Sequence, residues 1–202
     1  MKVTAVSIIV SSLDSAVEIR VASYRERTML GGADASFEAY RQKHASRDPD
    51  LANMRFADEL RQLTTAEGLN ELASPPYAPA KTGNPPRRAR EAESTKYLWL
   101  VAPTTVPFAL ESLPEVRLQR GRLSHTNLTG GGPAHSGGEM WFTEASIIVM
   151  NGGSGRYLPR SAEELEDVAK AFKAVGYKVA HMGWDNELQV PARYFRGDPR
   201  WL

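Results

Sequence analysis

The chain has 202 residues, of which 42% are hydrophobic and 24% charged, a composition typical of a globular protein that folds as one domain over residues 1–202. Its formal charge of +1 provides no global field for nucleic acid or an anionic membrane. The sequence contains no cysteine, which excludes disulfides and thiolate metal sites. It has no long apolar run and no recognisable signal peptide, so we expect a cytoplasmic protein with no membrane partner, although delivery into another cell stays open.

In the first half of the chain we expect a β-hairpin followed by helices. The hairpin strands are rich in valine and isoleucine and flank a short polar turn. The helices show apolar residues at helical spacing, and Asp48–Pro49 forms an N-cap followed by an N1 proline. The expected strands are Lys2–Val10 and Ala16–Tyr24, and the expected helices are Asp34–Ala45, Asp48–Leu63 and Thr65–Leu72.

The second half begins after an exposed loop at 74–95, which is rich in proline and arginine. Five segments read as strands or extended chain before the last helix, and one follows it: Lys96–Ala102, Val106–Leu110, Glu115–His125, Glu139–Thr143, Ser146–Met150 and Tyr177–His181. The last helix opens with a capping box of Ser161 and Glu164, and Gly176 ends it. The aromatic tail from Gly183 should pack back on the body. This order predicts an α+β fold with a mainly antiparallel sheet, helices from the first half and one capped helix near the C-terminus.

Half of the sixteen glycines lie between Ser124 and Pro159, which makes this segment the candidate site. The stretch Asn151–Tyr157 follows an expected strand and precedes the capped helix. Its backbone N–H groups, with Ser154, Arg156, Tyr157 and Arg160, predict an anion cradle. It lacks the lysine of a Walker A loop and the glycine spacing of the dinucleotide fingerprint. The alternative is a tight turn whose glycines supply positive φ.

Proton transfer at this site would fall to His125 and Glu139, expected at the two mouths of the loop between them. Imidazole titrates near neutrality and a nearby carboxylate can fix its tautomer, which suits general acid–base catalysis. Thr126 and Asn127 are candidate ligand-binding residues beside His125, or they organise the turn. His125, His135 and Glu139 match a metal ligand set only in residue type, so we predict no metal, and the cofactor is left unknown.

Three segments together resemble a module of the plant IQ-motif-containing calmodulin-binding proteins and of some bacterial toxin-like or effector-like proteins. They are HTNLTGG from His125, the Gly137–Glu139 segment, and SGRYLP from Ser154 to Pro159. The resemblance covers about a quarter of the chain and implies a shared fold core and surface without an assigned reaction. Arg156 stands where that family has histidine, and no IQ motif is present, so calmodulin binding is not implied.

These observations favour a protein that binds an anionic, nucleotide-like small molecule. His125 and Glu139 would serve a transferase or hydrolase reaction, and whether the chain is an enzyme stays open. The alternatives are a non-enzymatic protein-interaction module and a toxin or effector domain. No nucleic-acid signature is recognisable, and a protein partner stays open.

Overall fold

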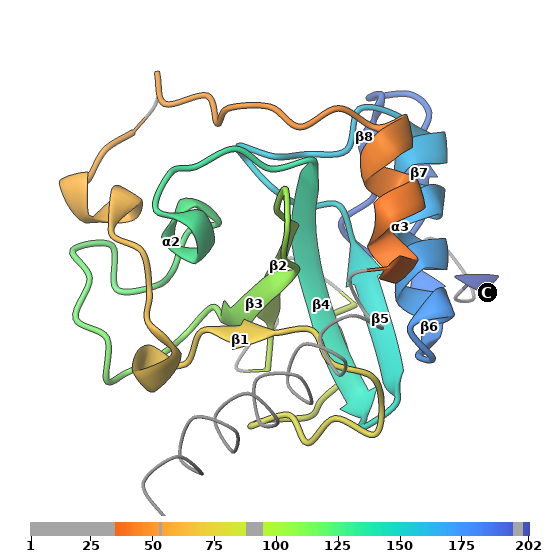
Figure 1. The fold of residues 1–202 in the computed structure, drawn as a ribbon, viewed down its shortest axis with the longest axis horizontal. Helices are drawn as coiled ribbons and strands as arrows, with labels where there is room; N and C mark the ends of the chain where they lie inside the picture. Colours follow the sequence, from red (N-terminus) through yellow and green to blue (C-terminus); the bar gives the residue numbers. More distant parts are fainter. Residues whose placement is uncertain (1–34, 53, 88–94, 196–199) are drawn as a thin grey trace, which may run out of the picture.

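The computed structural model describes residues 35–52, 54–87, 95–195 and 200–202, and it is organised around a seven-stranded sheet (Figure 1). The strand order is β1-β3-β2-β4-β5-β6-β9. The strands are β1 (Asn70–Glu71), β2 (Tyr97–Val101), β3 (Pro107–Leu110), β4 (Ser136–Glu144), β5 (Ile147–Asn151), β6 (Lys178–His181) and β9 (Arg200–Trp201), and β7 (Trp184–Asp185) and β8 (Val190–Pro191) form a separate ribbon. β5 and β6 pair in parallel, because a helix connects them, and the other neighbours are antiparallel. The predicted α+β class with a mainly antiparallel sheet is confirmed.

One face of the sheet carries the larger hydrophobic core and is covered by two helices. These are residues 35–43 and α3 (Ala162–Ala174), which lie side by side in Figure 1. Phe37 and Phe172 meet edge to face with ring centroids 5.2 Å apart, and Trp99 on β2 packs against Phe172 at 5.5 Å. The Ser161 hydroxyl accepts the backbone N–H of Glu164 at 3.1 Å, so the predicted N-cap is confirmed.

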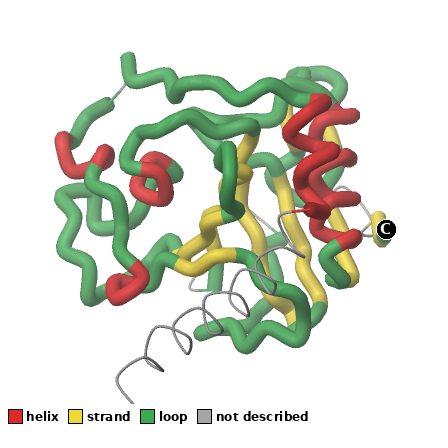
Figure 2. The backbone as a smooth tube through the Cα atoms, viewed as in Figure 1, coloured by secondary structure: helices red, strands yellow, loops and turns green. Residues whose placement is uncertain are grey.

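The opposite face of the sheet is covered only at its two ends. Leu98 and Leu100 alternate with the side chains of the first face and pack under α2 (Thr126–Thr129) and the loops beside it. At the other end, Trp141 and Val149 pack against the segment that follows β6, including Ala192. A polar strip is left between these two apolar clusters. Figure 2 shows that the covering layer on the α2 side is mostly loop with short helices.

The prediction of a helix over Asp48–Leu63 is wrong. Apart from the 3-10 helix η1 (Ala57–Leu60) and a turn at Leu51–Met54, the described residues of this segment form no regular element, and Leu51 and Met54 of the apolar stripe are exposed. The carbonyl groups of Asp58 and Arg61 accept hydrogen bonds from the Asn127 side-chain amide at 2.8 and 2.9 Å. Tertiary hydrogen bonds have therefore replaced the ones that a helix would make.

Two shorter predictions also need correction. The segment Thr65–Leu72 holds the 3-10 helix η2 (Thr65–Glu67) and then β1, with Gly68 at φ 95° ending the turn. Residues 115–125 form turns and no strand, so His125 is not reached through a hairpin partner of β4. The described helix at 35–43 agrees with the predicted Asp34–Ala45, whereas the predicted hairpin at 2–24 lies outside the described residues.

Within the described ranges, every helix is too short or too polar to cross a membrane. The predicted 74–95 loop has no regular element in its described part, residues 74–87 and 95. The tail packs back as expected at Trp184 and Ala192, while Trp201 is 45% exposed and lies over the Lys178 ammonium group.

Candidate functional site

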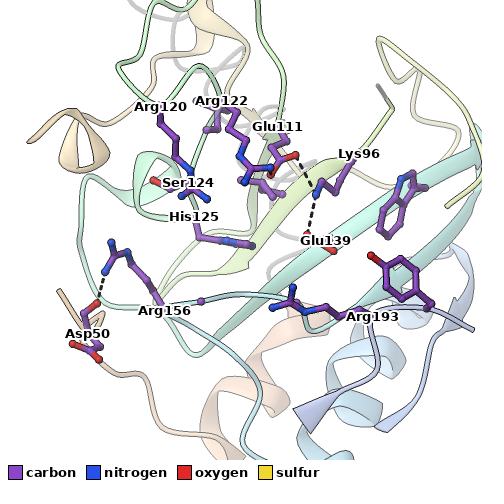
Figure 3. A pocket seen from close by; sticks show the side chains of 16 residues that line it. Asp50, Lys96, Glu111, Arg120, Arg122, Ser124, His125, Glu139, Arg156 and Arg193 are labelled. Atoms are coloured by element: carbon purple, nitrogen blue, oxygen red, sulfur yellow. Dashed lines mark hydrogen bonds and ion pairs between the residues drawn. The ribbon is translucent and has the colours of Figure 1, made fainter. Parts of the chain in front are cut away.

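A cleft of about 470 Å³ opens over the polar strip of the second face (Figure 3). Its volume lies within the range of about 300–1,000 Å³ that is typical of small-molecule sites. The strands supply its floor through Lys96, Leu98, Glu139 and Trp141. One wall comes from residues 120–125 and another from Arg193 and Tyr194, and Asp50, Glu111, Gly153, Gly155 and Arg156 complete the lining. His125, Glu139 and Arg156, which were predicted to share one hollow, all line this cleft.

The floor is centred on a buried lysine between two carboxylates. Lys96 Nζ lies 3.1 Å from Glu111 Oε2 and 3.0 Å from Glu139 Oε1, and its side chain is 8% exposed. The antiparallel register that pairs Tyr97 with Leu110 extends by one residue, because Glu111 donates its N–H to the Lys96 carbonyl at 2.9 Å. Strand pairing therefore brings these charges together, and each of them compensates a neighbour that would be costly to bury alone.

Asn151 positions Glu139 from the neighbouring strand. Its side-chain amide donates to Glu139 Oε2 at 3.0 Å, and its Oδ1 accepts the backbone N–H of Gly153 at 2.8 Å. Asn151 is fully buried and does not line the cleft, so the structure places this predicted ligand-binding residue behind the carboxylate. Both Glu139 oxygens thus have a protein partner, and their remaining lone pairs can accept from a ligand.

His125 lies beside Glu139 without bonding to it. Its Nε2 is 2.9 Å from the Gly138 carbonyl oxygen, which can only accept, so Nε2 carries the proton of the neutral ring. Nδ1 keeps a lone pair, and no described residue hydrogen-bonds it. Burial lowers the pKa of His125 to about 4, although the Gly138 bond and the Glu139 charge oppose this shift and Lys96 and Arg120 add to it. A backbone carbonyl, rather than the expected carboxylate, therefore fixes the tautomer.

The glycines of β4 are required by close packing. A Cβ at Gly138 would lie 2.0 Å from the Asn151 carbonyl oxygen, and one at Gly137 would lie 2.3 Å from the Leu100 side chain. A side chain at either position would displace the next strand or the residues that hold the His125 ring. The Gly137–Gly138 pair thus lets the ring lie close to the sheet.

The loop at 151–157 does not form the expected backbone cradle. Four of its N–H groups have acceptors within the loop: Gly153 donates to Asn151 Oδ1, Ser154 to the Gly152 carbonyl, and Arg156 and Tyr157 to Ser154 Oγ. None of the loop glycines has a positive φ, so the alternative of a left-handed turn is also wrong. Ser154 is a turn-forming residue with its hydroxyl directed to the backbone.

The two predicted loop arginines have different surroundings. Arg156 lines the cleft, but its Nη2 lies 2.7 Å from Glu59 Oε2 and its Nη1 bonds the Asp50 carbonyl. Arg160 lies outside the cleft lining with a side chain that is 52% exposed, and it donates to the Ala45 carbonyl at 2.5 Å. The N-terminus of α3 is closed by its own cap and does not reach the cleft.

Thr126, Asn127 and Tyr157, predicted as ligand-binding residues, are at most 1% exposed and do not line the cleft. Asn127 joins α2 to the 58–63 segment, as described above, and the Tyr157 hydroxyl donates to the Gly132 carbonyl at 2.8 Å. We therefore assign these three residues to the framework of the site.

The structure does not assemble the candidate metal ligands. His135 is away from the cleft, where its Nδ1 donates to the His44 carbonyl. Among the described residues, no three histidine or carboxylate side chains are grouped as metal ligands.

The cationic walls of the cleft were not predicted from the sequence. Arg120 and Arg193 approach from opposite sides of Glu139 in Figure 3. Neither forms an ion pair or hydrogen bond with another residue in the described part of the chain. Both lie in irregular segments with no motif, so no local signal marks them. Lys96 and Glu111 were also missed, and their positions at the facing ends of two neighbouring strands were the available signal.

The three motif segments that carry the resemblance meet around the cleft. His125 bonds the Gly138 carbonyl, and the Gly137 N–H donates to the Tyr157 carbonyl at 2.7 Å. Comparison with protein-family models, curated proteins and solved structures gives no match to this chain.

Proposed function

We propose that the cleft binds a small anionic ligand and that His125 transfers a proton to or from it, in a transferase or hydrolase reaction. The observation that carries this proposal is the pair of unpaired arginines, Arg120 and Arg193, on opposite sides of a cleft of about 470 Å³. Guanidinium groups recognise phosphate and carboxylate through paired N–H donors, and they stay charged at any physiological pH.

The chemistry of His125 supports the second part of the proposal. The Gly138 carbonyl holds Nε2 as the donor, so Nδ1 is the nitrogen that can accept a proton. Arg120 contributes to the lowered pKa of this ring, and a bound anion that neutralises Arg120 removes part of that effect. His125 therefore becomes more basic when the anion is in place. Glu139, already paired with Lys96, stabilises the positive ring that results.

The position of the three motif segments around the cleft extends this proposal. The motif segments form the floor and one wall of the cleft, so we propose that proteins with the same module share this cleft. Arg156, which replaces the histidine of the plant proteins, is paired with the buried Glu59 and serves the wall rather than the reaction.

Anion binding can be tested by thermal denaturation with inorganic phosphate and mononucleotides. A ligand that binds only the folded protein stabilises it by about 2.7 kcal/mol at a hundredfold excess over its Kd. R120Q and R193Q should each abolish most of this stabilisation. R117Q is the matched control, because Arg117 is exposed, carries the same charge and does not line the cleft. An equal loss in R117Q, or no stabilisation of the parent protein by any anion, would contradict the proposal.

The enzymatic part needs a separate measurement. Once a stabilising nucleotide is found, its turnover is followed by phosphorus NMR in the parent protein and in H125Q. Glutamine keeps an N–H donor for the Gly138 carbonyl but has no titratable nitrogen. Turnover that survives in H125Q would exclude His125 as the acid or base, and binding without turnover would favour a binding module.

A further inference from the structure

The floor of the cleft is unsuited to a bare anion. Glu111 and Glu139 present carboxylate oxygens beside Lys96, with side chains that are 14% and 21% exposed. Lys96 between them and Arg122, 3.7 Å from Glu111 Oε1, balance the two carboxylate charges, so the floor has no excess positive charge for a bare anion. A phosphate resting on this floor would face acceptors, whereas the arginine walls can hold it above them.

Trp141, which lines the same floor, has an unsatisfied donor. The residue lines the cleft and is 1% exposed, and its buried Nε1–H has no hydrogen-bond partner among the described residues. Buried polar groups nearly always have partners, so an orphan donor at a cleft needs an explanation. The atom is closed to solvent in this structure, so a ligand oxygen can accept from it only once the indole ring shifts on binding.

Carboxylate acceptors next to an indole donor match one chemical group in particular. A hydroxyl donates one hydrogen bond and accepts up to two, so it can satisfy both kinds of partner at once. A ligand with several hydroxyl groups can therefore donate to Glu111 and Glu139 and accept from Trp141. A fully ionised dicarboxylate has no hydrogen-bond donor, and monohydrogen phosphate has only one, so neither can donate to both carboxylates in this way.

We infer that the ligand is a polyhydroxylated phosphate ester, with its phosphate between Arg120 and Arg193 and its hydroxyl groups on the floor formed by Glu111, Glu139 and Trp141. This inference rests on the anion site of the proposed function and specifies its substrate class. A free pentose phosphate and the ribose phosphate of a nucleotide share this chemistry.

The test compares three phosphate monoesters of similar charge with inorganic phosphate by isothermal titration calorimetry. The ligands are ribose 5-phosphate, propyl phosphate, which has no hydroxyl, inorganic phosphate and adenosine 5′-monophosphate. We expect ribose 5-phosphate to bind at least about tenfold more tightly than propyl phosphate, the effect of one or two good hydrogen bonds. Comparison of adenosine monophosphate with ribose 5-phosphate identifies the source, because tighter binding of the nucleotide indicates a base subsite and weaker binding indicates a free sugar phosphate.

A matched pair of variants locates the recognition. W141F removes the indole donor but keeps an aromatic ring in the core, and it should lower affinity for ribose 5-phosphate about tenfold while leaving that for inorganic phosphate unchanged. W184F is the control, because Trp184 packs outside the cleft lining, and it should change neither affinity. The ratio of affinities in the parent protein tests the inference even if W141F fails to fold.

The outcomes separate this inference from the proposal beneath it. Equal affinity for ribose 5-phosphate and propyl phosphate in the parent protein would overturn the inference and leave the anion site standing. Loss of affinity in W184F equal to that in W141F would also overturn it. Absence of binding by every phosphate would refute the proposed function itself.

Discussion

Acidification should destabilise the fold through the buried ring of His125. Burial in the folded protein lowers the pKa of this ring from 6.5 to about 4. An unfolded chain returns the ring to water, where histidine titrates near its ordinary value of about 6.5. Because the unfolded state then binds a proton that the folded state does not, the stability contributed by the neutral ring is complete above about pH 6.5. It is lost as the pH falls toward 4.

The size of the effect follows from the gap between the two pKa values. At about 1.36 kcal/mol per unit, a gap of about 2.5 units corresponds to about 3 kcal/mol of unfolding free energy in full. Between about pH 7.5 and about pH 5.0, the same linkage gives a loss of about 2 kcal/mol. His135 and His181, whose pKa values burial also lowers, contribute losses of the same sign on acidification. The difference between the parent protein and H125Q isolates His125.

Urea unfolding at both pH values measures this difference. The parent protein should lose about 2 kcal/mol more than H125Q on going to the lower pH, with similar m-values for the two proteins. H125Q keeps a donor for the Gly138 carbonyl, so its own pH dependence reports the remaining groups. Parallel losses in the two proteins would show that the ring is not held neutral by burial, and the argument for the tautomer would fail with it.

Two further pairs of substitutions test the framework of the cleft by thermal and urea denaturation. G138A should prevent a stable fold, because its Cβ would lie 2.0 Å from a carbonyl oxygen of β5, whereas G155A, with nothing within 4 Å, should be close to neutral; equal effects would refute the packing argument. Burial would raise the pKa of Glu59, but the hydrogen bonds from Arg156 and the neighbouring backbone hold it below its ordinary value. E59Q should therefore cost about 3 kcal/mol, as expected for breaking a buried pair, whereas E163Q, in an exposed pair, should leave Tm nearly unchanged. A similar Tm in E59Q and E163Q would show that the Glu59 pair does not stabilise the fold.

The elements that could be predicted from the sequence carry strong local signals. The apolar run Lys96–Ala102 contains β2, and the capping box at Ser161 starts α3 one residue later. The helix predicted over Asp48–Leu63 has a local signal too, but the deciding hydrogen bonds come from Asn127, more than sixty residues away. Patterns within a window cannot contain such a partner.

In the candidate site too, some residues have a local sequence signal and others are placed only by distant contacts. His125 and Glu139 were predicted to lie together and both line the cleft, although a hairpin between them was the wrong reason. Lys96 reaches Glu139 because β2 and β4 are neighbours, a fact of topology that single-sequence reading did not supply. Arg193 has no pattern at all, and its role depends on where the tail packs.

The strands hold the floor of the cleft, while irregular chain carries its two arginine walls. Arg120 and Arg193 belong to neither hydrophobic core, so substitutions there should alter the ligand selectivity of the proposed site without endangering folding. Changes in the floor alter ladder residues and are constrained by both faces of the sheet. Among descendants of this chain, residues around the opening of the cleft should therefore diverge first, so ligand selectivity should change before the sheet does.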